Sequence, residues 1–160
     1  ESEIRGPEFV TRKISLGVSH YNLDNTKTLL LGNLDAKRDW GYAPEYVQGM
    51  KLMLSKESPS DYILATGKTH SVKDFISAAF SAIDVDIVFE GDGIDEKGIE
   101  KRSGKTLVEV SSDFFRPSEV DILVGNPQKA KLELNWSPKI QFDKLVERMV
   151  ISDINRLNAD

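Results

Sequence analysis

The chain has 160 residues, of which 39% are hydrophobic and 29% are charged, and its formal net charge at pH 7 is −5. These values are typical of an ordinary globular protein of about one domain, and the negative charge argues against a nucleic-acid binder, which needs a basic surface. The sequence has no cysteine for disulfides or cysteine metal sites, which fits a reducing, cytoplasmic setting, and it has neither a signal-peptide pattern nor an apolar run of the roughly 20 residues that cross a bilayer.

The first elements in chain order are a helix and a strand. Apolar residues near one face predict a helix over 9–20, and the apolar run at 28–31 predicts a short buried strand that ends at Gly32. The polar residues at 35–40 follow, and we expect them to form a charged loop.

A second helix and strand come next. Pro44 suits the first position of a helix over 44–54. Its apolar residues spaced for one face are Val47, Met50 and Leu54. The run Tyr-Ile-Leu-Ala at 62–65 predicts a strand, so residues 29–65 could form one βαβ crossover of a parallel sheet.

The clearest helix start in the sequence is at Ser71. Ser71 and Asp74 have the spacing of a capping box, and apolar residues continue with helical period to residue 83. The run at 87–89 predicts a strand, and the segment 90–105, rich in glycine and charge, predicts a mobile surface loop.

The last elements are a strand and two helices. We expect a strand at 107–110, and then a helix that starts with Asn126 as cap and Pro127 at its first position and ends near residue 135. An apolar stripe predicts a final helix over 142–157. Strands that alternate with helices place the chain in the α/β class.

No complete catalytic site is found among these residues. The sequence lacks a Gly-x-Gly-x-x-Gly or Walker-type loop, no tyrosine is followed by lysine four residues later, and no serine lies in a nucleophile elbow. The two histidines, His20 and His70, match no metal-ligand pattern, and His70 is expected to be a solvated turn residue before the helix cap.

Two arginines beside loops are the best candidates for ligand contacts. Arg38 lies between a predicted strand end and a helix start, where ligands bind in α/β sheets, and Arg116 precedes another turn. Two guanidinium groups match a diphosphate, and the nearby Glu119 could accept hydrogen bonds from a ribose diol. The alternative is that the two arginines form surface ion pairs with Asp39 and Asp121, and composition alone leaves both readings open.

Several collinear motifs resemble the GDP-mannose 4,6-dehydratase family, in the extended short-chain dehydrogenase/reductase superfamily. The most distinctive is Leu-Gly-Asn-Leu-Asp-Ala-Lys-Arg-Asp-Trp-Gly at 31–41. The others are the segment 1–14, Ala-Thr-Gly-x-x-His-Ser-Val at 65–72, Arg-Pro-Ser-Glu-Val-Asp at 116–121, and Lys-Ala with Leu-Asn-Trp-Ser-Pro at 129–138. The order of these motifs, and a sequence that starts without Met, predict that the chain is the C-terminal half of a longer enzyme, cut from its N-terminal cofactor domain.

The resemblance implies a fold and a reaction. The fold would be the last strands and helix of a dinucleotide-binding fold plus a small mixed α/β substrate domain, with 28–67 contributing to the parallel sheet and 71–160 forming the substrate domain and closing helices. The enzyme would be an NADP-dependent lyase that converts GDP-D-mannose to GDP-4-keto-6-deoxy-D-mannose, on the way to GDP-fucose. The family's catalytic Thr, Glu, Tyr and Lys lie upstream, so none is assigned here.

The resemblance also assigns binding residues. Those assigned to the GDP moiety are Val10, Lys13, Gly32, Asn33, Arg38, Arg116 and Glu119, with the two arginines on the diphosphate and Glu119 on the ribose. Arg5 is assigned to NADP, although Glu3-Ile4 replaces the family's usual Pro-Arg beside it. Glu45 also stands where the family usually has Asp.

Other functions remain as alternatives. The chain could belong to another nucleotide-sugar reductase or epimerase, which the run at 31–41 disfavours, or it could be a non-catalytic nucleotide-sugar binding or assembly module. We expect the isolated chain to lack dehydratase activity, to expose apolar surface where its partner domain would lie, and to belong to a homodimer or homotetramer by family resemblance.

Overall fold

A computed structural model of the chain describes residues 1–24, 27–116, 120 and 122–159. The elements are α1 (Val10–Asp24), β1 (Leu29–Leu31), β2 (Lys37–Arg38), α2 (Ala43–Leu54), β3 (His70–Ser71), α3 (Val72–Ser81), β4 (Ile87–Glu90), the 3₁₀ turn η1 (Gly93–Asp95), β5 (Lys97–Glu100), β6 (Thr106–Val110), β7 (Ile122–Leu123), α4 (Gln128–Leu134) and α5 (Phe142–Leu157). The chain is therefore a mixed α/β protein, as the sequence predicts.

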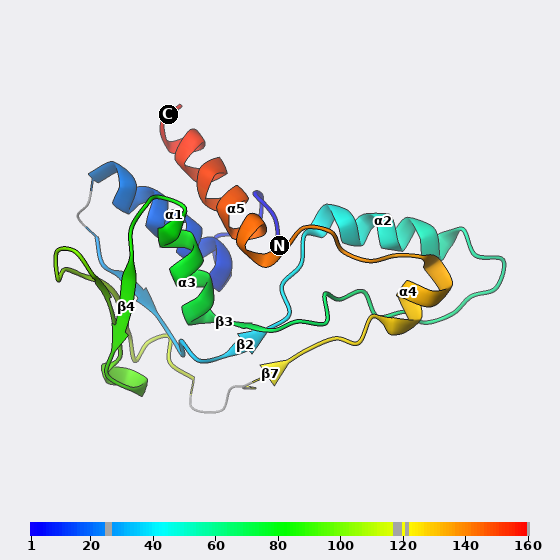
Figure 1. Cartoon of the computed structure of the whole chain (residues 1–160), viewed down its shortest axis with the longest axis horizontal. Coiled ribbons are helices and arrows are strands. Elements are labelled where there is room, and N and C mark those ends of the chain that lie inside the picture. The colour runs from blue at the N-terminus through cyan, green and yellow to red at the C-terminus, as the bar shows by residue number, and fades with distance from the viewer. Residues whose placement is uncertain (25–26, 117–119, 121, 160) are drawn as a thin grey trace.

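The elements form a larger part and a smaller part joined by a narrow middle (Figure 1). The larger part holds α1, α3, α5 and a sheet of order β1-β6-β5-β4, in which β1 is parallel to β6 and the other pairs are antiparallel. The smaller part holds α2 and α4. Between them, β2 pairs with β3 and β7 in a second, three-stranded sheet.

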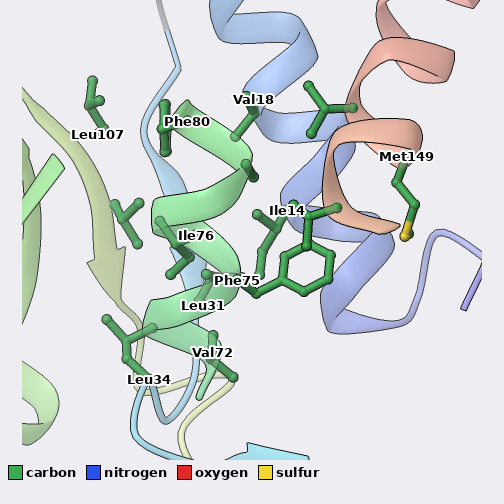
Figure 2. Close-up of a cluster of buried hydrophobic side chains, with 14 of the residues drawn as sticks. Ile14, Val18, Leu31, Leu34, Val72, Phe75, Ile76, Phe80, Leu107 and Met149 are labelled. Carbon is green, nitrogen blue, oxygen red and sulfur yellow. The ribbon is translucent and has the colours of Figure 1, made fainter. Parts of the chain in front are cut away.

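Helix α3 is the centre of the main hydrophobic core. It lies between the strands on one side and α1 and α5 on the other (Figure 2). The buried residues drawn there include Ile14, Val18, Leu31, Leu34, Val72, Phe75, Ile76, Phe80, Leu107 and Met149. The helical period of apolar residues after residue 71 is what directs this face of α3 to the core.

The predicted capping box at the start of α3 is confirmed. Ser71 Oγ accepts a hydrogen bond from the Asp74 backbone N–H at 3.0 Å, and Asp74 Oδ2 accepts one from the Ser71 backbone N–H at 2.8 Å. These bonds satisfy N–H groups that lack partners within the helix.

A second, smaller core holds α2 against α4. Ala130, Leu134 and Trp136 are buried there and pack against partly buried residues that include Tyr46. The Tyr46 ring meets the Trp136 ring edge-on at 5.5 Å, and Trp136 Nε1 donates a hydrogen bond to the Glu45 backbone oxygen at 2.8 Å.

Most predicted elements are confirmed, but the strand at 62–65 is wrong. These residues are in no ladder among the described part of the chain, and β1 instead pairs in parallel with β6. The proposed βαβ crossover over 29–65 is therefore also wrong. Residues 62–65 have the apolar pattern of a strand, but no strand in the described part of the chain lies beside them to complete a ladder.

The expected loop at 90–105 is wrong too, because it contains η1 and β5. Strand β5 pairs with both β4 and β6. Gly98 makes this close packing possible, since a Cβ there would lie 2.7 Å from Ile87 Cδ1. The buried Glu96 forms an ion pair with Lys73. The polar composition of residues 90–105 suggested a loop, but strand pairing and this ion pair hold the segment in place.

Smaller differences concern three other predictions. The charged segment 35–40 includes β2. Helix α4 starts at Gln128, one residue later than expected, and Asn126 Oδ1 accepts from the Gln128 backbone N–H at 3.0 Å. His70 is not a solvated turn residue: it lies in β3, half-buried, and its ring stacks on Phe142 at 3.7 Å. No helix in the described part of the chain has the length and apolarity to cross a membrane.

Candidate functional site

A pocket at the carboxyl end of β1 collects most of the predicted substrate residues. Its volume is about 360 Å³. It is lined by Glu8, Phe9, Val10, Lys13, Leu31, Gly32, Asn33, Val72, Phe114 and Arg116. Of the seven residues assigned to GDP by resemblance, Val10, Lys13, Gly32, Asn33 and Arg116 are present, although they come from three separate segments of the sequence.

Lys13 gives this β1-end pocket a positive group on α1. Its Nζ lies 3.3 Å from the centroid of the Phe114 ring, a cation–π contact. Burial lowers the pKa of Lys13, because desolvation disfavours its charged form. Phe9 and Val10 also line the pocket, so the N-terminal end of α1, with its partly positive dipole, lies beside Lys13.

Gly32 and Asn33 shape the wall of the pocket where β1 ends. A Cβ on Gly32 would lie 2.3 Å from the carbonyl oxygen of Phe114, so glycine lets residues 114–115 cross close to the strand end. Asn33 Oδ1 accepts a hydrogen bond from the Asp35 backbone N–H at 2.9 Å, which fixes the turn.

Arg116 is exposed and lines the same pocket as Lys13, but it comes from a different segment of the sequence. The segment after β6 carries it there, anchored by the Ser111 backbone N–H, which donates to the Leu31 oxygen at 2.8 Å. Glu119, assigned to the ribose, and Asp121, the alternative ion-pair partner of Arg116, lie outside the described residues.

Arg38 does not line the β1-end pocket. It lies in β2, beside a separate hollow whose lining includes Tyr46, Ile63, Leu123 and Val124. Its Nη1 donates to the backbone oxygens of Lys37 at 2.8 Å and of Val120 at 2.7 Å. The assignment of Arg38 to the same diphosphate as Arg116 therefore stays a prediction.

Asp39 has a role that the sequence interpretation missed. One carboxylate oxygen accepts from the backbone N–H and the hydroxyl of Thr66, and the other accepts from the backbone N–H groups of Gly67 at 2.9 Å and Gly125 at 3.2 Å. The carboxylate thus joins three segments of the chain. Gly67 and Gly125 lie far from Asp39 in the sequence, so no local pattern indicated that they meet.

Tyr46 has an unusual environment in the hollow beside Arg38. Its hydroxyl is buried without a hydrogen-bond partner among the described residues. Burial, with the negative charges of Asp39 and Glu45 nearby, raises the pKa of Tyr46 to about 12. At neutral pH it is therefore a neutral phenol and not a general base.

Arg5, assigned to NADP, is engaged within the chain. Its guanidinium lies 3.4 Å from the centroid of the Phe9 ring, and its Nε lies 3.4 Å from Glu1 Oε2. A single guanidinium held in this way does not form a dinucleotide site by itself. Within the described residues, no group of three or more His, Asp or Glu side chains could hold a metal ion.

Comparison with known proteins gives one consistent family. Residues 1–149 match the family model described as GDP-mannose 4,6 dehydratase. The chain is 50% identical to a GDP-mannose 4,6 dehydratase of Drosophila melanogaster, covering 100% of this chain and 40% of that protein, and 46% identical to the one of Homo sapiens, covering 100% and 43%.

Solved structures show the same fold at low sequence identity. RMD from Pseudomonas aeruginosa, complexed with NADPH, has a TM-score of 0.74 at 14% identity and covers 95% of this chain and 44% of that chain. A dTDP-glucose 4,6-dehydratase from Bacillus anthracis, in complex with NAD, has a TM-score of 0.72 at 16% identity and covers 99% and 43%. The chain thus spans less than half the length of each of these proteins.

Proposed function

Because this chain belongs to the GDP-mannose 4,6-dehydratase family, we propose that its β1-end pocket binds the GDP part of GDP-D-mannose, in an enzyme that forms GDP-4-keto-6-deoxy-D-mannose. The observation that supports this most is the meeting of Val10, Lys13, Gly32, Asn33 and Arg116 in one pocket. These residues come from three separate segments of the sequence, and the family resemblance assigns all five to the same ligand.

The charges in the pocket suit a diphosphate. Lys13 is partly desolvated, so its interaction with an anion is stronger than that of a fully solvated lysine. Arg116 can hold two phosphate oxygens through paired N–H groups. The one acid in the lining is Glu8, so the pocket has a formal net charge of +1 (two cations less one anion) within a chain of net charge −5.

The other assigned residues complete the proposal. Gly32 leaves space for the backbone at 114–115, and Val10 and Asn33 form the walls against which the nucleotide would lie. Arg38 would reach the diphosphate and Glu119 the ribose, as the resemblance implies. Both roles belong to the proposal.

The chemical step requires residues from outside this chain. By family resemblance, the catalytic Thr, Glu, Tyr and Lys and the main NADP loop lie in an N-terminal domain upstream. NADP, when bound, would take a hydride from the sugar and return it, and Arg5 would contribute a contact. We therefore propose that residues 1–160 supply substrate binding, with 28–67 contributing to the parallel sheet and 71–160 forming the substrate domain, and that the enzyme is a cytoplasmic homodimer or homotetramer.

Isothermal titration of the chain with GDP and with UDP tests this proposal. We expect weak binding of GDP, with binding of UDP weaker still, and no turnover of GDP-mannose by the 160-residue chain. Equal heats for both nucleotides would favour another nucleotide-sugar enzyme, and no heat for either would contradict the binding role. Turnover by the chain alone would refute the predicted inactivity.

A further inference from the structure

The β1-end pocket contains a carboxylate that the binding of a diphosphate does not use. Glu8 lines the pocket together with Lys13 and Arg116. Its side chain has no hydrogen bond or ion pair among the described residues, and Lys13 instead contacts the Phe114 ring. A negative charge repels a phosphate group in the same pocket, so Glu8 weakens binding of the ligand unless it accepts hydrogen bonds from another part of that ligand.

The turn before α1 determines where this carboxylate lies. The Phe9 backbone N–H donates to the Gly6 oxygen at 3.2 Å, which closes a turn over residues 6–9. The carboxylate folds back across the turn, because a Cβ on Gly6 would lie 2.5 Å from Glu8 Oε2 and 2.6 Å from Oε1. Pro7 restricts the backbone just before Glu8. The exposed carboxylate is therefore held in place by the backbone turn and is accessible to a ligand in the pocket.

The arginines assigned to the diphosphate indicate how a nucleotide would lie. Arg116 lines the β1-end pocket, whereas Arg38 lies outside it in β2. A diphosphate that reaches both arginines extends out of the pocket toward β2, and this leaves the pocket itself to the base. Apolar side chains suit a base there, since Leu31 and Val72 are nearly inaccessible and the Phe114 ring is 48% exposed.

Hydrogen bonds at the edge of the base would decide which base fits. Stacking on aromatic and apolar side chains is tolerant of base identity, because every base has a π-face. Among the described side chains of the pocket, Asn33 Oδ1 already accepts from the Asp35 backbone N–H, and Lys13 and Arg116 can only donate. The two oxygens of Glu8 are acceptors without partners. They match a base that presents two donors side by side.

We infer that Glu8 selects guanine, by accepting hydrogen bonds from its N1–H and its 2-amino group with the two carboxylate oxygens. Guanine carries these two donors next to each other on one edge. Uracil has one N–H between two carbonyl groups, and adenine has its amino group beside a ring nitrogen that accepts. A carboxylate facing either of these bases would place one oxygen against an acceptor, which is unfavourable. This inference rests on the proposed function and identifies the residue that makes the pocket specific for a guanine nucleotide.

The position of Glu8 next to a helix has a second physical consequence. Glu8 lies two residues before the first residue of α1, Val10, where a negative charge interacts favourably with the helix dipole. A residue that acted only on the dipole would change the Tm of the chain but not its choice among nucleotides. Asp143, in the first turn of α5 and outside the pocket, is the matched control for that role.

Titration with nucleotides that differ at one position of the base tests the inference. Inosine diphosphate (IDP) lacks the 2-amino group of GDP. The chain should bind GDP at least about tenfold more tightly than IDP, because a hydrogen bond to a charged acceptor is lost. In Glu8→Gln the two affinities should differ by less than about threefold, since the amide has one acceptor oxygen in place of two. Asp143→Asn should keep the ratio of the unsubstituted chain.

Xanthosine diphosphate (XDP) gives a readout that a structural role would not change. Xanthine has a carbonyl oxygen where guanine has the 2-amino group, so its edge matches an amide, which both donates and accepts. The chain should prefer GDP to XDP by at least about tenfold, and Glu8→Gln should reverse the order, with XDP binding at least about threefold more tightly than GDP. An unchanged preference for GDP in Glu8→Gln would overturn the inference.

The outcomes separate the role of Glu8 from the proposed function. Equal affinities of the chain for GDP, IDP and XDP would overturn the inference and leave the proposed binding of GDP in place. Binding of none of the three nucleotides would contradict the proposed function, and the inference would be overturned with it. A lower Tm of Glu8→Gln with unchanged nucleotide ratios would assign Glu8 to the dipole of α1 and overturn the inference.

Discussion

Gly32 and Phe114 lie so close that a Cβ on residue 32 would be 2.3 Å from the Phe114 carbonyl oxygen. The contacting atom belongs to the backbone, so it cannot rotate away as a side chain would. Gly32→Ala should therefore displace residues 114–116, including Arg116, and weaken GDP binding at least about tenfold, or about 1.4 kcal/mol. Isothermal titration would measure this change.

Gly93→Ala is the matched control for that substitution. A Cβ on Gly93 meets nothing within 4 Å, but its φ of +58° makes alanine strained, at a cost of about 1 kcal/mol. It should lower stability without changing GDP affinity. If the two alanine variants bind GDP equally well, the close approach at Gly32 does not shape the site.

A buried ion pair joins α1 to α5. Arg12 Nη2 lies 2.8 Å from Asp153 Oδ1, both side chains are nearly inaccessible, and Ser15 Oγ donates to Asp153 Oδ2 at 2.7 Å. Asp153→Ala would leave the Arg12 charge buried without its partner, so the free energy of unfolding should fall by about 3–5 kcal/mol. Urea unfolding would measure it.

The exposed pair between Lys144 and Glu147, with an N–O distance of 2.6 Å, is the control for the buried pair. Glu147→Ala should change the free energy of unfolding by less than about 1 kcal/mol, because solvent screens exposed charges. A similar loss of unfolding free energy in Asp153→Ala and Glu147→Ala would mean that the buried pair of Arg12 and Asp153 matters no more for stability than an exposed pair.

Tyr46 should titrate well above the ordinary pH range of a tyrosine. Its pKa is raised to about 12 by burial and by the charges of Asp39 and Glu45. Since the neutral phenol is favoured in the folded state, its contribution to stability is present below pH 10, the ordinary value, and is lost as the pH rises from 10 towards 12. Ultraviolet titration of the phenolate would follow it.

Tyr46→Phe should remove the last step of that titration and cost little stability, because the hydroxyl has no hydrogen-bond partner among the described residues. Tyr62→Phe, at an exposed phenol hydrogen-bonded to Glu133, should leave the last step in place. A last step that persists in Tyr46→Phe would show that the hydroxyl is solvated.

Asp39→Asn should loosen the junction of three segments. The amide keeps one acceptor oxygen, so either the N–H groups of Gly67 and Gly125, or the N–H and the hydroxyl of Thr66, would lose their acceptor, at a cost of about 2 kcal/mol. Hydrogen exchange at Gly67 and Gly125 should accelerate. Asp35→Asn, at an exposed ion pair with Lys73, should leave these amides unchanged, and unchanged amides in Asp39→Asn would contradict the junction.

Local patterns predicted the helices well because their signals lie within a few residues. The capping box of Ser71 and Asp74 and the apolar stripe of α5 depend only on the helical period, and both are confirmed. The strand at 62–65 was predicted from the same kind of local pattern, but a strand needs a neighbour, and no neighbour is supplied by the described part of this chain.

The sequence predicted which residues belong to the site, but not how the fold arranges them in space. Family motifs named Lys13, Gly32 and Arg116, and the structure brings them together. The separation of Arg38 from that pocket depends on the pairing of β2 with β3 and β7, which joins residues far apart in sequence. The junction at Asp39 depends on the same long-range pairing, so no motif indicated it.

The binding role of the β1-end pocket is tested most directly by titrating GDP into the chain and into Arg116→Ala, with Arg102→Ala as the control at an exposed arginine outside the pocket. A guanidinium that holds a phosphate should be worth about 1.4 kcal/mol or more, so we predict at least about tenfold weaker binding for Arg116→Ala and unchanged binding for Arg102→Ala. Full GDP affinity in Arg116→Ala would contradict the account.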